Sequence, residues 1–172
     1  MDASASSNVS SSNVSSSETS EMSADMIQID GITYCFPMAA QELVNNGWVM
    51  EDGFPFPARP GSNALVGFTK GYLELETNVT SVTGTEVPME EGSISYLIFS
   101  SEYNKDIPVV FPGNITFGMS KEEAEKVLPN GFTYDADKDS HVYEKQEENG
   151  ELIIQIKYSA NEVIGISYSF WS

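Results

Sequence analysis

The chain has 172 residues, of which 40% are hydrophobic, and it carries a formal net charge of −18 at pH 7. This length allows one domain or two small ones, and the composition is sufficient for a packed core. The charge excludes nucleic acid and anionic membrane surfaces as expected partners, because both repel an acidic protein. The chain has one cysteine, Cys35, so no intramolecular disulfide can form.

Residues 2–25 are rich in serine, with eleven Ser and a tandem SSNVS at 6–10 and 11–15. Because they offer so little to bury, we expect residues 1–25 to be a disordered tether. A Ser-rich tether before an acidic body resembles mature bacterial lipoproteins. This implies an extracellular or cell-envelope protein of a Gram-positive bacterium, held at the membrane only through a lipid anchor on a preceding segment. The alternative is a cytosolic protein with a flexible N-terminus.

The first half of the body, residues 26–104, opens with a predicted hairpin, because Asp30-Gly31 lies between alternating apolar residues. A short helix is expected after Pro37, ending at Asn46-Gly47 before Trp48 returns to the core. Three strands should follow, in NALVGFTKG at 63–71, YLELETNV at 72–79 and SISYLIFSS at 93–101.

The second half, residues 105–172, repeats this order. Ser120 and Glu123 form a capping box that predicts a helix start. Ala124, Val127 and Leu128 form its expected apolar stripe, and Pro129 to Gly131 should end the helix. Strands are expected over 140–148, 151–159 and 162–171.

The two halves also end in similar sequences, ISYLIFS at 94–100 and ISYSFWS at 166–172. These parallels predict an α+β fold of two tandem repeats. Each repeat would be a short helix packed on a three- or four-stranded antiparallel sheet. The expected organisation is therefore a tether over 1–25, one repeat over 26–104 and a second over 105–172.

Two motifs resemble known families. GMSKEEAEKVLPNG at 118–131, followed by a β-meander, resembles the helix start of beta-lactamase inhibitor protein-like domains and of small outer-membrane lipoprotein (SmpA/OmlA) domains. IDGITYCFP at 29–37 is similar to uncharacterised exported lipoproteins of Gram-positive gut bacteria. The resemblance implies a protein that binds another protein or an envelope component, by a concave sheet face in the first group.

One acidic loop suggests a cation site. Asp135, Asp137 and Asp139 occupy positions 1, 3 and 5 of an EF-hand-like calcium loop. Ser140 stands where such a loop needs glycine, and Gln146 stands where it needs a bidentate glutamate. The other interpretation is a solvated acidic loop without an ion, and we expect no cofactor.

No catalytic signature is present, and we expect no enzyme activity. Cys35 and His141 could pair as nucleophile and base, but a buried structural thiol and a surface histidine are the simpler interpretation. The carboxylates at 122–125 and 144–151 are explained by an exposed helix face and a hairpin turn, without the chemistry of a glycosidase.

The leading functional prediction is therefore a non-enzymatic, exported or cell-surface binding module, acting as a monomer. The alternative is a calcium-responsive or structural envelope protein that uses the 135–139 loop. The Pro-rich FPFPARPG loop at 54–61 presents aromatic side chains and an arginine, as interaction hot spots do. The candidate contact residues are Phe54, Phe56, Arg59, Tyr72, Tyr103, Tyr134 and Tyr143.

Overall fold

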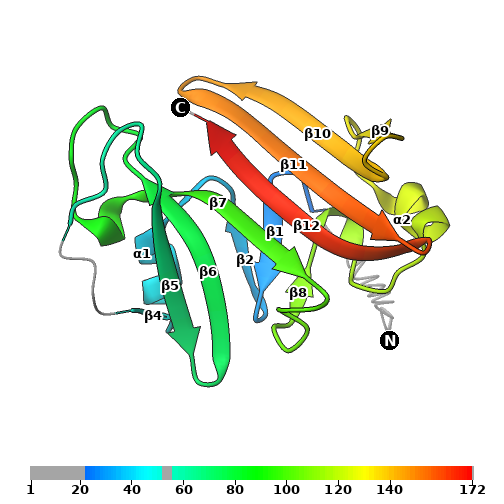
Figure 1. Ribbon diagram of the computed structural model, residues 1–172, viewed down its shortest axis with the longest axis horizontal. Coiled ribbons are helices and arrows are strands. Elements are labelled where there is room, and N and C mark those ends of the chain that lie inside the picture. The colour runs from blue at the N-terminus through cyan, green and yellow to red at the C-terminus, as the bar shows by residue number, and fades with distance from the viewer. Residues whose placement is uncertain (1–21, 52–55, 172) are drawn as a thin grey trace, which may run out of the picture.

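The computed structural model describes residues 22–51 and 56–171, and most of their regular structure is β-strand (Figure 1). The helices are short: α1 (Ala40–Asn45), α2 (Lys121–Val127) and the 3-10 helices η1 (Met89–Glu91) and η2 (Pro112–Asn114). The strands are β1 (Met26–Ile29), β2 (Ile32–Cys35), β3 (Met38–Ala39), β4 (Val49–Met50), β5 (Ala64–Lys70), β6 (Leu73–Thr80), β7 (Ser93–Ser100), β8 (Val109–Val110), β9 (Thr133–Asp135), β10 (Ser140–Glu147), β11 (Gly150–Ser159) and β12 (Glu162–Trp171).

Nine strands form one antiparallel sheet, in the order β4-β5-β6-β7-β12-β11-β10-β9, with β3 paired to β7. The central ladder joins residues 96–100 of β7 to residues 165–169 of β12. Strands from both sides of residue 104 therefore share one sheet. Figure 1 shows its strands changing direction from the steep β5–β6 hairpin to the diagonal β10–β12 strands.

Alternation along these strands gives the large sheet one buried face. Leu97, Tyr168 and Ile154 lie side by side across β7, β12 and β11, and all three are buried. The next row along the strands, Phe99, Ile166 and Ile156, is buried as well. The core of the protein lies against this face.

A three-stranded sheet, in the order β2-β1-β8, covers part of the buried face. Its hairpin turn is the predicted one, since Asp30 and Gly31 have φ of 49° and 78°, which favours the two-residue type I′ turn. Two contacts fix it to the large sheet: the Tyr168 hydroxyl donates to the Met26 carbonyl (3.1 Å), and the rings of Phe36 and Tyr168 lie 5.4 Å apart.

The two α-helices begin and end close to where the sequence predicts. Helix α1 stops at Asn45, and Trp48 is fully buried after the turn at Gly47. The Ser120 side chain caps α2 by accepting from the Glu123 amide, and the Glu123 carboxylate accepts from the Ser120 amide. The predicted apolar stripe is only partly correct, because Ala124 is buried while Val127 is 44% exposed.

The expected fold of two α+β repeats, each a helix packed on its own sheet, is wrong. Over residues 22–51 and 56–171 the protein is mostly β, with one nine-stranded sheet, one three-stranded sheet and two short α-helices. The physical reason is strand pairing: β7 and β12 each have a free edge after their own hairpins, and these edges pair with each other. The domain boundary at residue 104 and the disordered tether over residues 1–25 stay predictions. Ala24, which lies within the predicted tether, is however buried.

Candidate binding face

One face of the nine-stranded sheet is covered by no other element within residues 22–51 and 56–171, and we call it the open face. The helix α2 and the three-stranded sheet contact the opposite face, as the pairs Glu125–His141 and Met26–Tyr168 show. The exposed and half-exposed side chains of the open face include Val49, Glu51, Leu65, Glu74, Glu76, Asn78, Tyr96, Ile98, Val142, Glu144, Ile153, Gln155, Lys157, Ile164 and Trp171.

At the centre of the open face, β7 carries large apolar side chains and β12 carries small residues. Tyr96 and Ile98 point out from β7, whereas the neighbouring positions of β12 carry only Gly165, Ser167 and Ser169. These small residues leave space beside the larger ones. The face therefore combines exposed apolar side chains with hollows, which is typical of a contact surface.

The larger hollow, about 530 Å³, lies over β6, β7, β12 and β11. A β-bulge helps to form it: Lys157 pairs with Gly165 and Tyr158 with Val163, so that Ile164 is the extra residue. Its lining comprises Glu74, Glu76, Ile98, Phe99, Ser100, Tyr103, Asn104, Lys157, Ile164, Gly165 and Ile166.

Acidic and basic side chains lie at opposite walls of this hollow. Glu74 and Glu76 lie on β6 at one wall, and Lys157 lies on β11 at the other. The Glu51 carboxylate lies beside them, over Gly67, which pairs with Glu76. Among the described residues, the ion pairs involve none of these three glutamates. The β6 wall is therefore an acidic wall without a cation of its own.

A smaller hollow, of about 190 Å³, lies on the same face near the end of β12. Asn63, Asn78, Tyr96, Ser169 and Trp171 are among its lining residues. Trp171 is 60% exposed. The open face therefore carries aromatic side chains at both of its hollows, with Tyr103 at the larger one.

The predicted contact residues do not form one patch. Tyr103, which is 80% exposed, lines the larger hollow. Tyr72 is exposed in the turn between β5 and β6, and Phe56 is exposed in the loop after β4. Arg59 forms an ion pair with Glu86 (Nε to Oε1, 2.8 Å). Phe54 lies outside the described residues.

The remaining two predicted aromatic residues belong to the covered side of the sheet. Tyr143 packs on Phe132, with ring centroids 5.4 Å apart, and pairs with Ile154 in the buried row. The Tyr134 hydroxyl donates to the Asp139 carboxylate at 2.7 Å. The structure thus joins a predicted contact residue to a predicted metal ligand, in a role that the sequence did not indicate.

The three aspartates of the acidic loop do not converge. The Asp139 carboxylate accepts from the Lys121 ammonium at 2.9 Å, and Asp135 pairs with Lys138 at 3.2 Å. Asp135 also accepts from the backbone amides of Asp137 and Lys138. The bond from Lys138 lowers the pKa of the Asp135 carboxyl below its ordinary value, and the bonds from the Tyr134 hydroxyl and then from Lys121 do the same for the pKa of Asp139. No group of three or more possible ligands that could hold a metal is present in the described part of the chain.

A polar cluster beside α2 gathers the side chains that could otherwise do chemistry. His141 was expected at the surface, but it lies on the covered face and is buried, because its strand pairs it with buried Ile156. Its Nδ1 is 2.9 Å from the Tyr158 hydroxyl, and its Nε2 is 3.9 Å from Glu125.

The same cluster holds Lys121, whose ammonium lies 3.7 Å from the centroid of the Tyr134 ring. Burial, followed by the Glu125 charge, raises the pKa of Tyr158 to about 12, which disfavours a tyrosinate nucleophile at neutral pH. The members of the cluster contact one another, so the cluster joins α2 to β9–β11.

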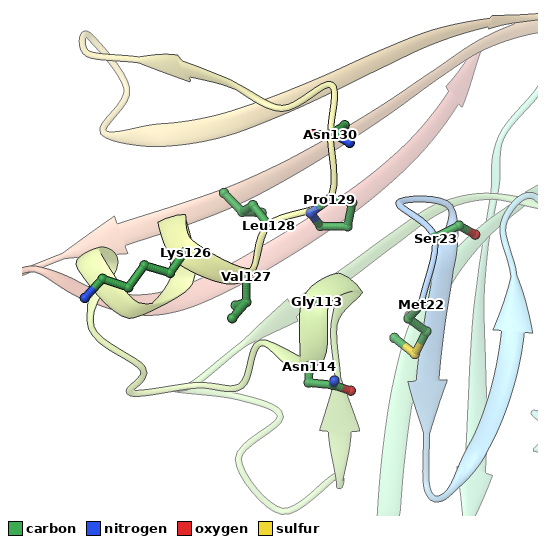
Figure 2. Close-up of a pocket in the computed structure, with 9 residues that line it drawn as sticks. All are labelled: Met22, Ser23, Gly113, Asn114, Lys126, Val127, Leu128, Pro129 and Asn130. Atoms are coloured by element: carbon green, nitrogen blue, oxygen red, sulfur yellow. The ribbon is translucent and has the colours of Figure 1, made fainter. Parts of the chain in front are cut away.

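Two further places bear on the chemistry of the chain. Cys35, expected to be buried, is exposed, because alternation turns Tyr34 inward on β2 and Cys35 outward. A hollow of about 550 Å³ lies between residues 22–23, η2 and the end of α2, and Figure 2 shows the residues that line it. Lys126 is the ionisable residue of its lining, and its ammonium pairs with Glu122 and points away from Asn114 (Figure 2).

Sequence reasoning missed the residues that define the open face. The available signal was SISYLIFSS, an apolar run without clean alternation, which indicates a strand with apolar side chains on both faces. The outward glycine and serines of β12 carry no such signal.

Comparison with protein-family models, with curated proteins and with solved structures found no match. The family resemblance of the 118–131 motif therefore stays a prediction from the sequence. Within the described residues, no helix has the length and apolar character that a membrane crossing requires.

Proposed function

We propose that the protein is a non-enzymatic, exported or cell-surface binding module that contacts another protein through the open face of its nine-stranded sheet. The observation that carries this proposal is the combination of exposed apolar side chains and hollows on a sheet face that no described element covers. Ile98 is 40% exposed at the centre of the sheet, and Leu65 and Trp171 are more exposed still. Exposed apolar surface of this kind is costly in water unless a partner covers it.

The absence of enzyme activity is part of the proposal. The side chains best suited to acid–base chemistry, His141, Tyr158 and Glu125, contact one another on the covered side of the sheet. The open face itself offers glutamates and a lysine on opposite walls of a hollow. This arrangement supports recognition better than proton transfer.

The location outside the cytoplasm is also part of the proposal, and it is supported by the Ser-rich residues 2–25 and the single cysteine. Fractionation of cells that express the native gene tests it directly. Recovery of the protein in the envelope or the medium is the expected result. Recovery with cytosolic markers contradicts the proposed location but leaves the proposal of a binding face unaffected.

Site-specific photo-crosslinking tests the binding face. A photoreactive phenylalanine is placed at Ile98 on the open face, and in a control at Ile32, which is comparably exposed on β2 of the three-stranded sheet. With envelope proteins of the source organism, we expect a saturable adduct from position 98 and none from position 32. Excess unlabelled protein should compete, but its Ile98→Asp variant should not. Equal adducts from both positions, or no competition, contradict the proposal.

A further inference from the structure

We propose that the larger hollow of the open face binds a Lys or Arg side chain presented by an extended protein segment. This inference rests on the proposed binding function and names the chemistry of its partner. The acidic wall of β6 would hold the cation, and the apolar floor of the hollow would hold the aliphatic stem of the side chain. The occupant is thus a basic segment of another protein.

Charge at the β6 wall favours a cationic occupant. Glu74 and Glu76 point to the same side of β6, and Glu51 reaches the same area from the end of β4. Like charges this close repel, and a cation placed between them relieves that repulsion. Elsewhere in the described chain, lysines supply such cations, for example Lys121 to Asp139 and Lys126 to Glu122. At the β6 wall no described residue does so, which leaves the position to a partner.

The apolar floor of the hollow favours a side chain with an aliphatic stem. Ile98 and Ile164 line the hollow between its charged walls, and both are partly exposed. The exposed ring of Tyr103 lies at the same hollow. A Lys or Arg side chain has an aliphatic stem that packs on such residues and a charged head that interacts favourably with an aromatic ring. The volume of about 530 Å³ lies within the range of ordinary ligand sites.

The two walls of the hollow carry opposite charges, which fixes where a cation would lie. Lys157 lies on β11, three strands away from β6, which corresponds to roughly 14 Å at ordinary strand spacing. A bound cation would therefore lie at the β6 wall, away from the like charge of Lys157. The net charge of −18 favours a basic partner over an acidic one throughout the approach.

Peptide binding tests the inference. The probe is a synthetic eight-residue peptide of alternating Arg and Val, and its matched control carries citrulline, a neutral analogue, in place of each Arg. Titration calorimetry with the full chain should give at least about tenfold weaker binding of the citrulline peptide. The double variant Glu74→Gln/Glu76→Gln should weaken the Arg peptide by about tenfold, since each exposed ion pair contributes up to about 1 kcal/mol.

Two variants separate this site from general charge attraction. Glu90→Gln/Glu91→Gln makes the same change in net charge on η1, next to α1, and should weaken binding less than twofold. Lys157→Gln removes a repulsive group and should strengthen binding about two- to threefold. Equal weakening by both glutamate pairs, or equal binding of the citrulline peptide, overturns the inference. If the Ile98 crosslink persists in that case, the proposed binding function stands and only the cationic partner is wrong.

Discussion

The carboxylate of Glu51 lies over the backbone of Gly67, in the space that a β-carbon at position 67 would occupy. A Cβ built there would lie 2.4 Å from both Cδ and Oε2 of Glu51. Because Gly67 pairs with Glu76 across the β5–β6 ladder, the two glutamates meet on one side of the sheet. Glycine at this position therefore lets a residue from the end of β4 join the acidic wall.

Gly67→Ala should displace the Glu51 carboxylate without unfolding the sheet. The clash involves the far end of a flexible, exposed side chain, and alanine is favoured over glycine in a strand by roughly 0.5–1 kcal/mol. We expect unchanged or slightly higher stability in urea denaturation, together with a few-fold weaker binding of the Arg peptide. Glu51→Gln is the matched control and should weaken binding similarly. A large loss of stability in Gly67→Ala would show that the Glu51 position is structural.

Gly113→Ala should destabilise the protein much more than Gly118→Ala. Both glycines have positive φ, 74° and 78°, so alanine costs roughly 1–2 kcal/mol at either position. At Gly113, a Cβ would also lie 2.1 Å from the Val127 carbonyl oxygen, whereas at Gly118 it meets nothing within 4 Å. The clash with backbone should add roughly 1–3 kcal/mol. Urea midpoints that fall equally in both variants would contradict this close approach of η2 to α2.

The strands were predictable because local turn chemistry marks their ends. Asp30-Gly31 gives the β1–β2 turn, and Ala160 and Asn161, with φ of 49° and 70°, give the β11–β12 turn. These residue pairs act through backbone preferences of one or two positions, which a single sequence displays directly. The strands β5, β6, β7, β10, β11 and β12 accordingly lie within about one residue of where the sequence places them.

The pairing of β7 with β12 was not predictable in the same way. It joins Ile98 to Ser167, residues far apart in the chain, and depends on which free edges meet after the hairpins have formed. Since the open face is created by that pairing, its residues were missed together. His141 and Cys35 were misplaced for a related reason: a shift of one position along a strand moves a side chain to the opposite face.

Cys35 should react with a thiol reagent in the folded protein. Its side chain is exposed on β2, and partial burial, followed by the Asp25 charge, raises the pKa of the thiol above the ordinary value. At pH 8, a disulfide reagent such as DTNB should therefore label one thiol per chain without denaturant, but more slowly than it labels free cysteine. Lys145 lowers this pKa, so Lys145→Gln should slow the reaction further. If labelling requires unfolding, the thiol is buried in the folded protein, as the sequence suggested.

Acidification from pH 7.5 to 5.5 should weaken the fold through His141, the single histidine of the chain. Desolvation lowers its pKa below the ordinary 6.5, the nearby Glu125 and Asp139 raise it, and Lys121 lowers it. Because the folded-state pKa is the lower one, the unfolded chain takes up the proton first as the pH falls. The contribution of neutral His141 is therefore complete above about pH 6.5 and is lost as the pH drops towards the folded-state pKa.

Urea denaturation at several pH values measures this effect, and NMR titration of the single imidazole gives its folded-state pKa directly. In His141→Gln, the fall in the urea midpoint between pH 7.5 and 5.5 should be smaller, because the titrating group is gone. In Glu125→Gln, the imidazole pKa should fall further, since the carboxylate that favours protonation has been removed. A folded-state pKa above 6.5, or a fold that strengthens on acidification, would mean that His141 is not held neutral between Tyr158 and Glu125.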